Sequence, residues 1–152
     1  MKGNNGSGNN VSRDDWRTPK ELFNTLNNQY NFAFDCCASK ENRKCELYSD
    51  DFQNEWLRLH RAWINPPFSK ATEMIDHFFD RTISGIGIYR IDNIESYLWN
   101  FILNNADWVF IIRGRTNYEG HEGHGARFGS ALFGVGVPPP ENIEGVALKR
   151  YS

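Results

Sequence analysis

Residues 62–68, with the sequence Ala-Trp-Ile-Asn-Pro-Pro-Phe, constrain the fold of this chain more than any other stretch. The first three residues suit a buried strand, which must end at Ile64 because proline lacks an N–H and fixes φ. The loop that follows is stiff, and it offers the amide of Asn65, the carbonyl of Pro66 and the ring of Phe68. Two oxygens can accept both hydrogens of an amino group while the ring stacks on its plane. The loop therefore favours a planar ligand that carries an NH₂ group.

Helices and strands are expected to alternate along the rest of the chain. Thr18 can cap a helix whose first residue is Pro19, and Glu21 completes a capping box. Apolar residues at helical spacing predict two further helices, one over 70–83 and one capped by Asn93. The remaining strands, of which the final one lies at an edge, are expected at 32–36, 85–89, 107–112, 129–137 and 146–148. This alternation predicts an α/β sheet with crossover connections.

The length of 152 residues is typical of one domain, which we expect over residues 14–152. Residues 1–13 are mostly Asn, Gly and Ser, so we expect a disordered tail. The sequence has no run of 18 apolar residues and no apolar leader, so we expect neither a membrane span nor secretion. The three cysteines include no Cys-x-x-Cys pair, which favours free thiols in a reducing cytoplasm.

Residues 113–127 are polar and glycine-rich, and they include Arg113, Arg115 and Arg127. A loop of this length that cannot bury itself is usually functional or mobile. Leaving the sheet at a strand end, it can lie on DNA phosphates, although the net charge of −2 gives no support for a basic surface. A flexible loop and a DNA contact both stay open. The spacing of His121 and His124 does not fit a zinc protease motif, and we expect no metal site.

Asp35 stands at the end of the apolar strand expected at 32–36. Open α/β sheets bind ligands beyond the carboxyl ends of their strands, where an acid can meet an ammonium group or a ribose. An exposed acid at a strand end is the alternative interpretation. No Gly-x-Gly follows Asp35, so the dinucleotide-binding fingerprint is absent.

Four motifs follow one another in the order of a known family. They are Trp16-Arg17-Thr18-Pro19, Phe34-Asp35-Cys36-Cys37-Ala38, Asn65-Pro66-Pro67-Phe68 and Gly114-Arg115. From about Asp15 to about Phe133 the chain resembles the small phage-type DNA N6-adenine methyltransferases, the Dam-like enzymes that use S-adenosylmethionine (SAM). The resemblance implies a compact Rossmann-like α/β fold, with a mostly parallel sheet and helices on both faces. It also implies double-stranded DNA as the partner.

The resemblance further implies roles for single residues. The catalytic loop would consist of Asn65, Pro66, Pro67 and Phe68. SAM would be bound by Trp16, Thr18, Pro19, Asp35, Cys36, Asp51 and Asn65. DNA would be contacted by Lys70, Arg113, Arg115 and Arg127. No metal is implied.

The ribose of SAM is often held by an acid after the second strand in methyltransferases of this fold. Asp50 or Asp51 can serve here, although two acids in a turn are also typical of solvated turns and helix caps. The target base would be flipped out of the duplex and stacked on Phe68, with its amine held by Asn65 and the Pro66 carbonyl.

Two alternatives stay open. Asn-Pro-Pro-Phe or Asn-Pro-Pro-Tyr also occurs in methyltransferases of RNA guanine and of protein glutamine, and a non-catalytic DNA-binding relative would keep the same pocket. The chain departs from the family at Tyr89-Arg90, where the family usually has an apolar strand ending in Leu-Pro. This departure affects the far wall of the expected base pocket.

Overall fold

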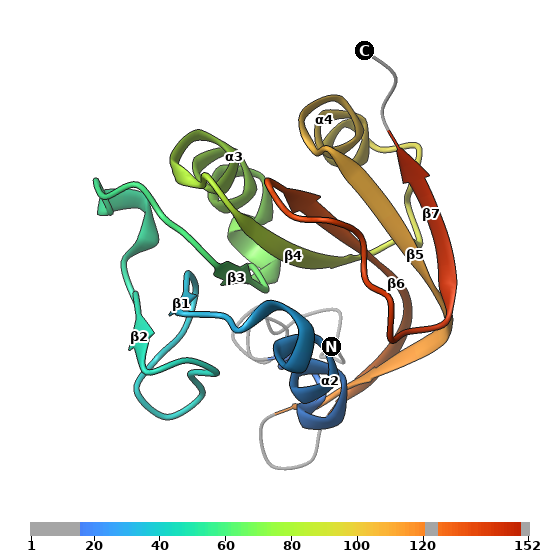
Figure 1. The fold of residues 1–152 in the computed structure, drawn as a ribbon, viewed down its shortest axis with the longest axis horizontal. Coiled ribbons are helices and arrows are strands. Elements are labelled where there is room, and N and C mark those ends of the chain that lie inside the picture. The colour runs from blue at the N-terminus through green and yellow to red at the C-terminus, as the bar shows by residue number, and fades with distance from the viewer. Residues whose placement is uncertain (1–15, 121–124, 150–152) are drawn as a thin grey trace, which may run out of the picture.

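The computed structural model describes residues 16–120 and 125–149, so the tail expected at 1–13 lies outside the described residues. The described strands form one seven-stranded sheet in the order β2-β1-β3-β4-β6-β5-β7 (Figure 1). They are β1 (Phe34–Asp35), β2 (Leu47–Tyr48), β3 (Ala62–Ile64), β4 (Gly85–Arg90), β5 (Trp108–Tyr118), β6 (Ala126–Val135) and β7 (Gly145–Lys149). The helices are α2 (Lys20–Tyr30), α3 (Ala71–Arg81) and α4 (Tyr97–Asn105), with 3₁₀ turns η1 (Phe52–Asn54) and η2 (Phe68–Lys70).

The α/β class is confirmed, but the expectation of a mostly parallel sheet is wrong. The strands β2, β1, β3 and β4 are parallel neighbours. In contrast, β6 runs antiparallel to β4 and β5, and β7 runs antiparallel to β5. Because β5 and β6 are the longest strands, the antiparallel pairs contain most of the paired residues. Strands that follow each other without a crossover helix pair in the antiparallel sense, which is the case for β5 and β6.

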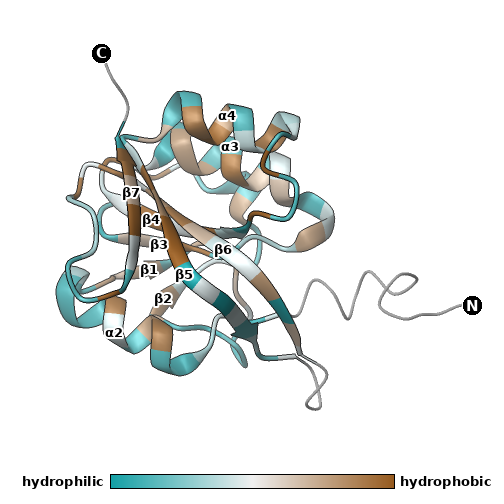
Figure 2. Ribbon diagram, turned by 90° about the vertical axis from the view of Figure 1, so that its right-hand side faces the viewer, coloured by the Kyte–Doolittle hydropathy of each residue, from teal (hydrophilic) through white to brown (hydrophobic). Residues whose placement is uncertain are grey.

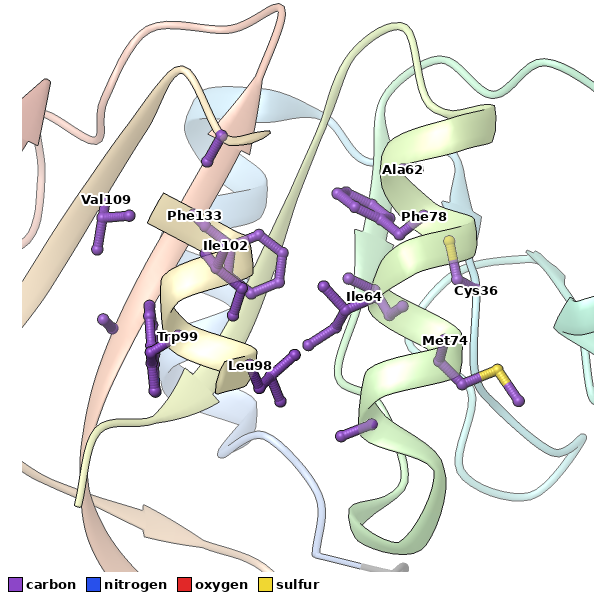
Figure 3. Packing of buried hydrophobic residues seen from close by; sticks show 14 of the residues in the cluster. Cys36, Ala62, Ile64, Met74, Phe78, Leu98, Trp99, Ile102, Val109 and Phe133 are labelled. Atoms are coloured by element: carbon purple, nitrogen blue, oxygen red, sulfur yellow. The ribbon is translucent and has the colours of Figure 1, made fainter. Parts of the chain in front are cut away.

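Helices cover both faces of the sheet, as expected (Figure 2). Successive strand residues point to opposite faces. Trp63 of β3 therefore packs on α2, with its ring centroid 5.4 Å from that of Phe23. Ile64 belongs to the buried cluster on the other face, together with Phe78 of α3 and Ile102 of α4 (Figure 3). No helix in the described part of the chain is long and apolar enough to cross a membrane.

The predicted cap of the first helix is wrong. α2 begins at Lys20, and the side chain of its N-cap residue, Pro19, makes no hydrogen bond to the helix. Thr18 is only 1% exposed, so its hydroxyl is turned into the protein and away from the helix end. Instead, Oε2 of Glu119 accepts a hydrogen bond of 3.0 Å from the N–H of Lys20. An acid from the far end of β5 thus satisfies a backbone donor of α2.

The cap predicted for the third helix also differs from the structure. α4 is capped by Ser96, whose Oγ accepts a hydrogen bond from the N–H of Trp99, and not by Asn93.

The segment expected as a loop at 113–127 is a β-hairpin in its described part. β5 continues to Tyr118 and pairs with β6, so that Tyr118 faces Ala126. The register shifts between Ile111 and Arg115, where Gly114 has a φ of +78° that favours glycine. His121 and His124, whose spacing does not fit a zinc protease motif, lie outside the described residues.

Candidate active site

Asn65 follows the last residue of β3, and its side chain is hydrogen-bonded to a residue far away in the sequence. Its Nδ2 donates a hydrogen bond of 3.1 Å to the carbonyl oxygen of Trp16. Because the nitrogen is engaged in this way, Oδ1 is the atom that takes the role of acceptor for a ligand. Pro66 is buried, and Pro67 has a φ of −63°, so the backbone of the loop is fixed before η2 begins.

Three cavities meet at Asn65. The first, which we call the aromatic cavity, is lined by Trp16, Asn65, Pro66, Phe68, Tyr89, Arg90, Tyr118 and Phe128. The ring centroid of Trp16 lies 5.1 Å from that of Phe128 and 6.3 Å from that of Phe68. The hydroxyl of Tyr118 lies 2.7 Å from Oγ of Ser130. Rings on several sides suit a flat aromatic ligand.

The second cavity, the acid cavity, is polar. It is lined by Trp16, Arg17, Thr18, Asp35, Cys37, Asn42, Lys44, Trp63 and Asn65. Asp35 is 3% exposed, and its Oδ2 accepts a hydrogen bond of 2.8 Å from the N–H of Lys44. Burial raises the pKa of Asp35 to about 6, while the backbone N–H groups of Lys44 and Cys37 and the charge of Lys44 act in the opposite direction.

Thr18 adds a second indication that the acid cavity takes a polar ligand. Its Oγ1 is buried and has no hydrogen-bond partner among the described residues. Buried polar atoms are nearly always paired, so an unpaired hydroxyl beside a buried carboxyl is expected to meet a ligand or water. The acid cavity, whose lining includes the acid Asp35 and the bases Arg17 and Lys44, therefore suits a polar ligand that offers a hydrogen-bond donor to Asp35.

The third cavity, the open cavity, has a volume of about 260 Å³. It is lined by Cys37, Ala38, Ser39, Asn42, Ser49, Asp50, Phe52, Asn65, Pro67 and Met74. Phe52 and Met74 supply apolar surface, and Asp50 supplies a carboxylate. This combination suits a nucleoside, whose base needs apolar contacts and whose ribose hydroxyls need an acceptor.

The structure brings four of the predicted SAM-binding residues, Trp16, Thr18, Asp35 and Asn65, to these cavities. Cys36 is not among the lining residues. Its side chain is fully buried in the cluster beside α3, and the next residue, Cys37, lines the acid and open cavities instead (Figure 3). The reason is the alternation of side chains at the end of β1.

Pro19 and Asp51 also lie elsewhere. Pro19 precedes α2 and borders a groove between that helix and β5. Both carboxylate oxygens of Asp51 accept from Nδ2 of Asn54, at 3.0 and 2.9 Å, which places Asp51 at the start of η1. Asp50 is the acid that borders the open cavity, and it is the better candidate for a ribose.

The predicted DNA-binding residues are spread over two surfaces. Lys70 is exposed at the end of η2, next to the Asn-Pro-Pro-Phe loop. Arg113 forms an exposed ion pair with Glu144 at 3.6 Å, and Arg115 borders the groove beside α2. Arg127 is exposed on β6. Among the described residues, the arginine that lines the aromatic cavity is Arg90.

Our sequence interpretation did not predict four residues of the aromatic cavity as site residues, Tyr89, Arg90, Tyr118 and Phe128. Tyr118 and Phe128 were hidden because residues 113–127 were expected to form a loop. In the sequence, Thr116 and Tyr118 alternate with the more polar Arg115 and Asn117, and this alternation was the available signal of a strand. The departure of Tyr89-Arg90 from the family pattern was the signal for Arg90.

The fold and cavities define an α/β protein in which one asparagine, held at the end of a parallel strand, lies between a nucleoside-sized site and an aromatic site. Among the described residues, no group of three or more His, Cys, Asp or Glu is arranged to hold a metal ion. The sequence model of the family described as DNA N-6-adenine-methyltransferase (Dam) matches residues 6–130. The chain therefore belongs to this family. A comparison with curated proteins gave no match.

Proposed function

We propose that this protein transfers the methyl group of SAM to N6 of adenine in double-stranded DNA, as a single domain over residues 14–152. Membership of the Dam family supports this reaction. The observation that carries the proposal is the position of Asn65, where the acid, open and aromatic cavities meet. A residue at that junction contacts both ligands of a group transfer.

The residues of two cavities fit SAM. When bound, SAM supplies an electrophilic methyl group. The carboxyl of Asp35 would hold its ammonium group, and the unpaired hydroxyl of Thr18 would bond to its amino acid part. Asp50 would accept from the ribose, with Phe52 and Met74 beside the adenine ring. These groups are donors, acceptors and apolar surfaces of the kinds that SAM requires.

Asn65 would prepare the amine of the target base. The lone pair of adenine N6 is delocalised into the ring, so the amine is a weak nucleophile. Oδ1 of Asn65 and the carbonyl of Pro66 can accept its two hydrogens and favour a tetrahedral nitrogen whose lone pair is available. The hydrogen bond to the carbonyl of Trp16 fixes the amide orientation beforehand, so the site needs little reorganisation.

The aromatic cavity would receive the adenine after it is flipped out of the duplex. Phe68, Trp16 and Phe128 offer ring surfaces for stacking. Lys70, Arg115 and Arg127 are exposed and can contact phosphates, whereas Arg113 already pairs with Glu144.

The test is methylation of DNA that lacks N6-methyladenine, with the modified base measured by mass spectrometry. Asn65→Ala should reduce the rate by about 10²–10³ because one preorganised acceptor is lost. The matched control is Asn105→Ala, since the Asn105 amide also donates to a carbonyl, that of Phe101, on the exposed side of α4. Both variants should melt like the parent protein.

Three outcomes would contradict the proposal. An Asn65→Ala protein that methylates at the parent rate would remove Asn65 from the mechanism. Label that appears in RNA or protein and not in DNA would support the other amino methyltransferases. A parent protein that binds DNA and never labels it would support a non-catalytic relative.

A further inference from the structure

Arg90 is the last residue of β4, and its guanidinium lies between two aromatic rings of the aromatic cavity. Its Cζ is 3.8 Å from the centroid of the Phe68 ring and 5.2 Å from that of Phe128. Both distances are within the range of a cation–π contact. Its Nε lies 3.4 Å from Oδ1 of Asp92, and its side chain is 18% exposed. The guanidinium is therefore largely buried in the cavity that the target base would enter.

The stacked guanidinium occupies the position over Phe68 that a base would need. Both residues line the aromatic cavity, so the side chain and a stacked base compete for the same space. At 3.8 Å the guanidinium covers the face of Phe68 that borders the cavity. A base can stack on this face only after the side chain of Arg90 has left it.

The backbone of Arg90 is fixed, but its side chain has a way out. Arg90 pairs with Ser130 of β6, and its carbonyl accepts a hydrogen bond of 2.7 Å from Nε1 of Trp99. Asp92, its ion-pair partner, is 45% exposed, so this pair leads from the cavity towards solvent. A rotation of the long side chain is enough to open the cavity without a change in the sheet.

We propose that Arg90 is a specificity residue which occupies the base site in the DNA-free protein and must be displaced by the target base. The inference rests on the proposed function and adds a substrate preference to it. A free nucleoside must displace the cation without compensation. A nucleic acid strand brings phosphates, which pair strongly with a guanidinium that leaves the cavity. Arg90 therefore favours an adenine presented by a polynucleotide over free adenosine.

The test is the binding of radiolabelled adenosine, measured by equilibrium dialysis on the full chain saturated with S-adenosylhomocysteine, which blocks the cofactor cavities. Arg90→Ala should bind adenosine about 3- to 30-fold more tightly than the parent, as expected for loss of one cation–π contact. Arg43→Ala is the matched control, because Arg43 lies over the ring of Tyr48 at 5.4 Å and lines none of the three cavities. It should bind adenosine like the parent.

Two further variants keep the test decisive. If Arg90→Ala does not fold, Arg90→Gln replaces it in the test. This variant removes the charge but keeps a polar side chain, so it should show a smaller gain in the affinity for adenosine. Addition of Phe68→Ala to Arg90→Ala should abolish the gain, because the exposed ring is the stacking surface. A gain that persists without Phe68 would show that adenosine binds elsewhere and would overturn the proposal.

The remaining outcomes separate this inference from the proposed function. Unchanged or weaker adenosine binding by Arg90→Ala, in a protein that methylates DNA, would overturn the role of Arg90 alone. If Arg90→Ala binds adenosine more tightly but the parent protein labels no DNA, the result would support displacement of Arg90 and refute adenine methylation.

Discussion

Asp35 is a buried acid without a cation bonded to it in the described structure. Its ionised form is therefore energetically unfavourable in the free protein. Its carboxyl is 3% exposed, and burial raises its pKa to about 6. The N–H of Lys44 offsets only part of the desolvation. A ligand with a positive charge at this position would lower the pKa of Asp35 and would bind best to its ionised form.

The affinity for SAM should therefore depend on pH. Below a pKa of about 6, Asp35 is protonated in the free protein, so the affinity should fall by up to about tenfold for each further unit of pH. Calorimetry at pH 5, 6 and 7 measures this change. Asp35→Asn should bind weakly with no such dependence, and an equal dependence in this variant would remove Asp35 from the site.

The same substitution should stabilise the free protein at pH 7. The pKa of Asp35 is about 6 in the folded state and 3.8 in the unfolded state. Its favourable contribution to the free energy of unfolding is therefore fully present below pH 3.8 and is lost as the pH rises to about 6. At pH 7, Asp35→Asn should raise the free energy of unfolding by up to about 3 kcal/mol. Urea unfolding at pH 4 should show no such gain.

At the scale of elements, the hairpin of β5 and β6 stabilises a helix far away in the sequence, since Lys20 and Glu119 are 99 residues apart. Glu119 accepts from the N–H of Lys20, and Arg17 and Glu119 also form a backbone bridge. Trp16, which holds Asn65, lies immediately before this bridge. The hairpin therefore positions the segment on which the orientation of Asn65 depends.

Glu119→Ala should destabilise the protein by about 0.5–2 kcal/mol because a backbone donor at the start of α2 loses its acceptor. Glu144→Ala is the matched control, since Glu144 forms an exposed ion pair with Arg113 and should contribute little. Thermal unfolding of the two variants provides the comparison. Equal melting temperatures would show that the contact of Glu119 does not stabilise α2.

The capping of α2 shows which parts of the fold can be predicted from local sequence. Thr18, Pro19 and Glu21 match a capping box, but Thr18 lines the acid cavity with its hydroxyl buried, and a distant acid replaces it as the partner of the helix. Buried strands such as the one at Trp108 were predictable because their apolar runs are local. The polar half of the hairpin was not predictable from its own sequence, because polar residues form a strand only where a partner strand pairs with them.

At the scale of the whole molecule, the site lies where the two halves of the sheet meet. Asn65 follows a strand of the parallel half, whereas Tyr118 and Phe128 belong to the antiparallel half. The residues on the parallel side could be predicted from the Asn-Pro-Pro-Phe motif, because they are adjacent in the sequence. The contact between Arg90 and Phe68 joins the ends of β4 and the loop after β3, and it depends on the strand order, which no local pattern contains.

The mixed sheet also implies an order of assembly. β5 and β6 are joined by a short connection, so they can pair early at a small loss of chain entropy. The pairs of β1 with β2 and β3 have two residue positions each and require longer loops to close. In native-state hydrogen exchange, amides of β5 and β6 should therefore open only with global unfolding, whereas those of β1 and β3 should exchange through partial opening.

Addition of SAM should slow exchange in β1 and β3 selectively, because Asp35 and Asn65 lie at the ends of these strands. Equal protection of both halves with and without SAM would contradict this order. If it holds, the methyl donor completes the folding of the half of the sheet that binds it, and a cell short of SAM would contain a protein that is more easily degraded by proteases.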